Sequence, residues 1–152
     1  MSVYRNIQVI VVVFFIALCT AFKSQNSPVK NMGVLIVNLS NIDTPSGRVR
    51  VGLYNRDNFL TKNYIIARSV GISSRSNVSV TFNDLPYGEY AVAVYHDIND
   101  NKSLDKTAIG IPNEPYAFSN NYKVYMRPPS YDEVKINFQQ GLTLDLKLLR
   151  WW

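Results

Sequence analysis

The sequence predicts an all-β fold, a single antiparallel β-sandwich of seven to nine strands. The first observation is compositional: of the 152 residues, 12% are aromatic, with ten Tyr, and only 18% are charged, a balance that favours pleated, half-buried strands. The second is that apolar residues recur at every second position, and no long amphipathic helix pattern occurs. The third is that turn-forming residues separate these stretches at the short intervals typical of a sandwich or barrel.

The expected strands follow one another from residue 33 onwards. The clearest places Val49, Val51 and Leu53 on one face and Arg48 and Arg50 on the other, which is the alternation of a strand with one buried side. Eight strands are expected by the same criterion, at 33–39, 48–54, 65–72, 78–82, 89–96, 122–126, 134–138 and 142–148.

The connections between these strands carry their own signals. The segment 41–47 contains an Asp, a Pro and a Gly, all residues that favour turns. Residues 56–62 are expected to form one helical turn that buries Phe59 and Leu60.

Residues 1–21 have the organisation of a secretory signal peptide. Arg5 precedes an apolar run at 7–18, and Cys19-Thr20-Ala21 supplies small residues for cleavage after Ala21. The apolar stretch is shorter than the roughly 20 residues that span a bilayer, so no permanent membrane span is expected. An alternative is lipidation at Cys19, although Leu18 is larger than the residue that usually precedes a lipidated Cys.

This organisation predicts a signal peptide at 1–21, a short polar leader at 22–31 and a β-sandwich domain at 32–150. The protein is expected to be exported and to act in the periplasm, on the cell surface or as a secreted protein. Cleavage after Ala21 would remove the only Cys, so disulfides and thiol chemistry are not expected in the mature chain.

The charge balance bears on the class of partner. The formal net charge is +5, and the basic residues are scattered rather than clustered, which argues against nucleic acid. The expected partner is an unknown envelope or extracellular ligand, either a glycan or a protein.

The stretch 85–94, Leu-Pro-Tyr-Gly-Glu-Tyr-Ala-Val-Ala-Val, contains a turn followed by a strand. It resembles the Leu-Pro-x-Gly-x-Tyr-x-Val turn of transthyretin-like and collagen-binding-B-like sandwiches. The resemblance implies a transthyretin-like or immunoglobulin-like arrangement, in which the Tyr90 hydroxyl pins the corner. It carries no information about function.

A second stretch, from 96 to 121, is more specific. It contains His96-Asp97-x-Asn99-x-Asn101, then Leu-Asp, then Gly-Ile-Pro-x-Glu-x-Tyr-x-Phe-Ser-Asn-Asn. This pattern resembles domain-of-unknown-function family 2141, small exported bacterial proteins without an established activity. The family pattern has Gly where this chain has Asp100 and Lys102, and Gly where it has Ala117, which puts the loop geometry in question.

The loop 97–105 is the most informative candidate for a site. Oxygen-bearing side chains lie at alternate positions, and Ca²⁺ takes six to eight oxygen ligands. An EF-hand is rejected because Lys102 and Ala108 replace its Gly and Glu, and because a strand precedes the loop. The open alternatives are a Ca²⁺ loop on a sandwich and a loop closed by its own Asn and Asp side chains. The predicted ligands for Ca²⁺ are Asp97, Asn99, Asn101, Asp105 and Glu114.

Catalytic patterns are weak in this sequence. His96 is the only His, so a zinc site lacks partners, and no Gly-x-Ser-x-Gly elbow is present. His96 is expected to end a strand and bond a nearby loop. The predicted function is therefore a non-enzymatic module acting in binding or envelope structure. The alternative is an exported hydrolase that uses acidic residues near Asp97 and Glu114.

Two further segments allow both a binding and a structural interpretation. Tyr116 and Phe118, with the amides of 119–121, could form a recognition surface, or they could cap the sandwich and bond orphan backbone groups. The latter interpretation is preferred. The terminal Trp151 and Trp152 could contact lipid or a partner, or pack on a sheet edge.

Overall fold

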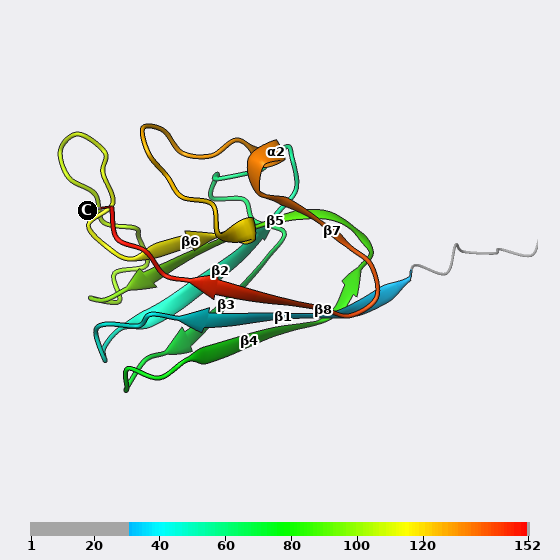
Figure 1. Ribbon diagram of the computed structural model, residues 1–152, viewed down its shortest axis with the longest axis horizontal. Helices are drawn as coiled ribbons and strands as arrows, with labels where there is room; N and C mark the ends of the chain where they lie inside the picture. The colour runs from blue at the N-terminus through cyan, green and yellow to red at the C-terminus, as the bar shows by residue number, and fades with distance from the viewer. Residues whose placement is uncertain (1–30, 152) are drawn as a thin grey trace, which may run out of the picture.

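The computed structural model describes residues 31–151, so the predicted signal peptide and all but the last residue of the leader lie outside the described residues. The described part folds as two packed β-sheets, which confirms the predicted β-sandwich with eight strands (Figure 1). None of the helices among these residues is long and apolar enough to cross a bilayer.

The smaller sheet has three strands in the order β4-β1-β8. β1 pairs antiparallel with β4 and parallel with β8, so the first and last strands of the fold are neighbours. Its strands are β1 (Met32–Ser40), β4 (Val78–Pro86) and β8 (Leu142–Lys147).

The larger sheet has the order β3-β2-β5-β6, and β7 also pairs with β5. All of its pairings are antiparallel. Its strands are β2 (Arg48–Tyr54), β3 (Ile66–Gly71), β5 (Gly88–Asp97), β6 (Tyr116–Phe118) and β7 (Lys135–Phe138).

The main hydrophobic core fills the space between the two sheets. Leu35, Val51 and Phe82 are among its fully or nearly fully buried members, as the alternation in β1, β2 and β4 predicts. A second cluster covers the outer face of the larger sheet, where α2 (Tyr131–Val134) contributes Tyr131 and Val134. The sheet is therefore covered on both faces near β5 and β6.

The turn before β5 is held as the sequence predicts. The Tyr90 hydroxyl donates a hydrogen bond to the carbonyl of Pro86 at 2.8 Å, and Gly88 has φ +155°. This bond ties the beginning of β5 to the end of β4 and confirms the corner role expected for Tyr90.

Two expectations for local structure are wrong. Residues 122–126 form part of a loop, and the strand expected there is replaced by β6 at Tyr116–Phe118. Leu60 is 43% exposed with φ +57°, so the turn at 56–60, which is not a helix, buries only part of Phe59.

Candidate functional site

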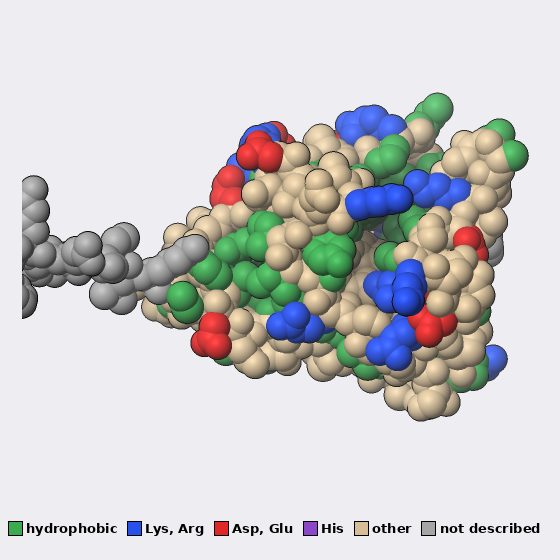
Figure 2. Space-filling model, turned by 180° about the vertical axis from the view of Figure 1, so that it is seen from behind, with side chains coloured by type: hydrophobic (Ala, Val, Ile, Leu, Met, Phe, Trp, Pro, Cys, Tyr) green, Lys and Arg blue, Asp and Glu red, His purple; other side chains and the backbone are tan. Residues whose placement is uncertain are grey.

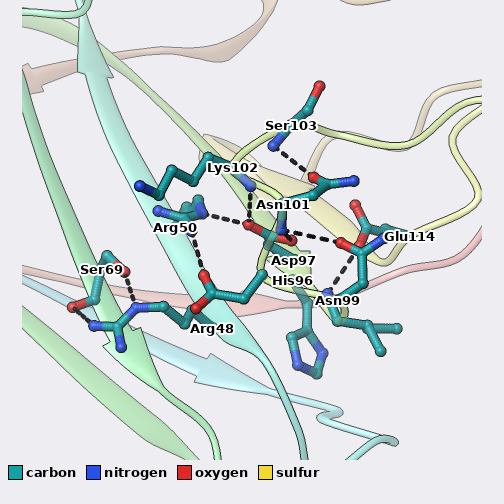
Figure 3. Close-up of polar contacts among 12 residues, drawn as sticks. Arg48, Arg50, Ser69, His96, Asp97, Asn99, Asn101, Lys102, Ser103 and Glu114 are labelled. Carbon is teal, nitrogen blue, oxygen red and sulfur yellow. Dashed lines mark hydrogen bonds and ion pairs between the residues drawn. The ribbon is translucent and has the colours of Figure 1, made fainter.

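The candidate site is built around Asp97, the last residue of β5. Its side chain is 0% exposed, and its hydrogen bonds run to the loop that follows and to Arg50 of β2 (Figure 3). Oδ1 accepts a hydrogen bond from the Asn101 N–H at 3.0 Å, and Oδ2 accepts one from the Lys102 N–H at 2.8 Å. Asp97 therefore closes the loop by binding the backbone four and five residues later.

The charge of Asp97 is balanced by Arg50 of β2. Arg50 Nε lies 2.6 Å from Asp97 Oδ2, and its Nη2 lies 2.5 Å from Asp100 Oδ1. Burial alone would raise the pKa of Asp97, but the hydrogen bonds from Arg50, Lys102 and Asn101 and the charge of Arg50 outweigh it and lower the pKa below its ordinary value of 3.8. Asp97 is therefore a buried carboxylate held in its charged form.

The loop backbone has a positive φ at two residues that are not Gly. Asp100 has φ +55° and Lys102 has φ +67°, a left-handed conformation that favours Gly. The sequence resemblance described above implies Gly at these two positions. Asp97 and Arg50 hold both turns in place, since each contacts one of these residues.

The Asn side chains of the loop bond its own backbone. Asn99 Oδ1 accepts from the Asn101 N–H at 3.1 Å, and Asn101 Oδ1 accepts from the Ser103 N–H at 2.8 Å. Their amide groups donate to the two oxygens of Asp105, at 2.8 Å and 2.9 Å. This is the self-bonded loop that one of the two alternatives predicted.

Glu114 connects the two ends of the loop. It is 4% exposed, and its Oε1 accepts from the Ile98 N–H at 2.8 Å while its Oε2 accepts from the Asp105 N–H at 3.1 Å. One carboxylate thus satisfies an orphan donor at each end of the segment, which explains why an acidic residue is buried here.

All five predicted ligands of Ca²⁺ therefore belong to one hydrogen-bonded network. The oxygens of Asp97 and Glu114 face N–H donors, and Arg50 supplies a positive charge. Among residues 31–151, no three His, Cys, Asp or Glu side chains form a group that could hold a metal ion. The Ca²⁺ site stays a prediction that a binding measurement must test.

His96 lies beside this network but is used elsewhere. It is fully buried, and its Nε2 lies 2.7 Å from the carbonyl of Ser46, which confirms the expected bond from a strand end to a nearby loop. Because a carbonyl only accepts, Nε2 carries the proton. Nδ1 has no hydrogen-bond partner among the described residues.

The segment Ser119–Asn121, labelled η1, has the structural role preferred from the sequence. The buried Ser119 hydroxyl contacts the backbone of Val92 and the carbonyl of Val134. Asn121 accepts from the Lys147 N–H at 2.9 Å and donates to the Asp145 carbonyl at 2.8 Å. Asn121 therefore occupies the outer edge of β8 much as a neighbouring strand would.

The chain terminus follows the packing alternative as far as it is described. Trp151 is partly buried and packs against the second hydrophobic cluster. Trp152 lies outside the described residues.

One feature was missed by the sequence reasoning. A hollow of about 720 Å³ lies at the end of the sandwich opposite the 97–105 loop, where the turns before β5 and after β7 meet the start of β1. Its lining is uncharged and rich in side-chain amides: Asn31, Tyr87, Gly88, Asn137, Gln139 and Gln140. The sequence feature that could have indicated this hollow is the Gln-Gln-Gly turn at 139–141. It contains no acidic or nucleophilic residue and so matches no catalytic or metal-binding pattern.

Comparison with known families gives one result. The model of a family described as an uncharacterized protein conserved in bacteria, domain of unknown function 2141, matches residues 37–144. The chain belongs to this family. Searches of the curated proteins and of the solved structures with this chain found no match. The family domain spans both sheets, from β1 into β8, and includes the whole Asp97 network.

Proposed function

We propose that this member of family 2141 is an exported, non-enzymatic module that binds a ligand in the bacterial envelope. The observation that carries the proposal is the use of the acidic residues. Asp97 and Glu114 are buried and each carboxylate oxygen accepts from an N–H group. The two carboxylates therefore stabilise the backbone of the loop 97–105.

The competing hydrolase needs a different arrangement. A glycoside hydrolase uses one carboxyl group that stays protonated and a second that is available to substrate or water. Here the pKa of Asp97 is lowered, and Glu114 is occupied by the amides of Ile98 and Asp105. The oxygens of both carboxyl groups are engaged by backbone N–H groups of the loop, so neither group is presented to a substrate while the loop is closed.

The hollow at the opposite end is the best candidate for the ligand site. Its side-chain amides each offer a donor and an acceptor, the combination that recognises hydroxyl groups. The Tyr87 ring packs edge-on against Phe138, with centroids 5.8 Å apart, so it is held in one position. An uncharged lining with a fixed aromatic ring suits a neutral glycan.

A glycan array that includes bacterial cell-wall and outer-surface oligosaccharides tests the proposal. Gln139→Ala and Asn137→Ala change exposed side chains and should weaken binding by roughly tenfold each, the effect of about one lost hydrogen bond. Asn77→Ala, an exposed amide remote from the hollow in sequence, is the matched control. Equal binding by all three variants would refute the assigned site.

The hydrolase alternative is tested separately on a panel of glycosides and esters. Turnover by the wild-type chain that Glu114→Gln abolishes, without a change in the circular dichroism spectrum, would overturn the non-enzymatic assignment.

Calcium is proposed only as a stabilising ion of the loop. Thermal unfolding is compared in millimolar Ca²⁺ and in chelator, because an ion that binds only the folded state raises Tm. We expect weak affinity, about 10⁻⁴–10⁻³ M, because Arg50 already contacts Asp97. Identical melting curves and no heat in a titration would leave the self-bonded loop as the complete description.

A further inference from the structure

Two loops that flank β6 carry large apolar side chains with no role in either hydrophobic cluster. Ile109 is 81% exposed, Tyr125 is 74% exposed and Met126 is 94% exposed. Both loops project from the same edge of the molecule, near the described end of the chain (Figure 1). From behind, small hydrophobic tips protrude at the upper right corner, with Lys and Arg side chains close by (Figure 2).

The first loop is closed at its base, so the exposure of Ile109 is built into the fold. Lys106 and Pro112 form a β-bridge. Within it, Thr107 accepts from Gly110 at 2.9 Å and donates to the carbonyl of Ile111 at 2.7 Å. Ile109 therefore lies at the end of a hydrogen-bonded turn, pointing away from the sandwich.

The second loop is fixed by Glu133, the third residue of α2. Its carboxylate accepts from the Tyr122 hydroxyl at 3.1 Å and from both terminal nitrogens of Arg127 at 2.9 Å. It also accepts from Ser130 through backbone and hydroxyl. The two sides of the loop are thus clamped together, and residues 123–126 between them form the tip.

The two segments that carry the tips contain only basic charged residues, and acidic residues lie at their bases, Asp105 before the first and Glu133 after the second. The segments 106–112 and 122–129 contain Lys106, Lys123 and Arg127 and no acidic residue. The charge of Arg127 is balanced by Glu133, whereas no ion pair is found for either Lys within residues 31–151. Two lysines beside exposed apolar tips match the headgroups and the acyl boundary of an anionic membrane.

We propose that these two loops form a membrane-docking surface, in which Ile109, Tyr125 and Met126 insert into the interface of an anionic bilayer while Lys106 and Lys123 contact its phosphates. The hydrogen bonds that close each loop keep the tips displayed in the free protein. Insertion into the bilayer therefore costs little conformational entropy. A protein partner would be recognised by a broader apolar patch with shape complementarity, and two separate loop tips do not provide one.

The test is flotation of residues 22–152 with lipid vesicles. This segment contains both hydrophobic clusters and lacks the apolar run at 7–18, which would bind lipid by itself. The vesicles are phosphatidylcholine, either alone or with about 30% phosphatidylglycerol. We expect flotation with the anionic vesicles and at least a tenfold weaker association with the neutral ones, because each lysine contributes about fivefold.

Three variants separate the contributions. Ile109→Ser with Met126→Ser should lower binding at least tenfold, and Lys106→Gln with Lys123→Gln should remove the preference for anionic lipid. Met32→Ser is the matched control, because Met32 is 50% exposed and is the first residue of β1, which begins at the opposite end of the sandwich (Figure 1). Failure of the wild-type chain to float, or equal flotation of the tip variant, would overturn the proposal. The glycan experiment tests a different end of the molecule, so the two results are independent.

Discussion

Arg50→Met removes the cation from the Asp97 network while it keeps a side chain of similar length. The change leaves a carboxylate with 0% exposure facing two backbone N–H groups and no positive charge. Loss of one partner of a buried ion pair costs about 3–5 kcal/mol, but solvent reaches the 20% exposed side chain of Arg50 and reduces this value. We expect a loss of about 2–3 kcal/mol in the free energy of unfolding, and a fall in Tm of roughly 6–15 °C.

The same variant should change the pH dependence of stability. In the wild-type chain the pKa of Asp97 is lower in the folded state than its ordinary 3.8. Its contribution is therefore present above that value and is lost as the pH falls through the folded-state pKa. Without Arg50, only the backbone N–H groups of Asn101 and Lys102 oppose the effect of burial, so the pKa of Asp97 is higher than in the wild-type chain. The stability difference between the two proteins should be largest near pH 7 and should shrink below about pH 4.

Urea unfolding at a series of pH values measures both effects. Arg75→Met is the matched control, since Arg75 is exposed, and it should change stability by less than about 0.5 kcal/mol. Adding Asp97→Asn to Arg50→Met should recover part of the loss, because the unpaired charge is then gone. A pH-independent difference, or strict additivity of the two substitutions, would refute the assigned ion pair.

Other substitutions test single contacts by urea unfolding. Ser119→Ala leaves the buried Val92 N–H without its partner and should cost about 1–3 kcal/mol; fast hydrogen exchange at Val92 should accompany the loss, and its absence would contradict the contact. Lys102→Gly should stabilise the chain by about 0.5–1 kcal/mol, since φ is +67°; a loss would mean that the side chain contributes to the loop. Asn121→Gly keeps the left-handed backbone but uncovers β8. It should cost about 1 kcal/mol and increase aggregation in light scattering, whereas unchanged behaviour would show that the edge needs no cover.

The strand alternation could be predicted from the sequence, but β6 could not. The alternation of Tyr122, Val124 and Met126 indicated a strand, yet Met126 is 94% exposed in a loop. All three residues of β6 are buried, because one face meets the main core and the other meets the second cluster. A strand covered on both faces shows no period of two, so the hydrophobic pattern does not indicate a strand at these residues.

The short helix α2 was missed for a different reason. Four residues are too few to show a helical period. Its local signal is the capping box formed by Ser130 and Glu133, in which each residue bonds the backbone of the other.

The residues of the candidate site were predicted as a group, because alternate oxygen-bearing side chains in a tight loop converge. Arg50 pairs with the carboxylates of Asp97 and Asp100. From the sequence, it was predicted only to lie on the polar face of a strand. Its position depends on the antiparallel register of β2 with β5, in which Arg48 lies opposite Asp97 and Arg50 opposite Tyr95. Register between strands separated by more than forty residues is not encoded in a local pattern, so the pairing needed the structure.

The parallel pairing of β1 with β8 has a consequence for how the chain acquires its structure. β1 is the central strand of the smaller sheet, and one of its two partners ends at Lys147. During synthesis, the sheet stays incomplete until almost the whole chain has emerged. Contacts of such long sequence separation form slowly. The smaller sheet therefore cannot be completed until the last strand arrives, and a product truncated before residue 142 would expose an unpaired edge of β1 to other chains.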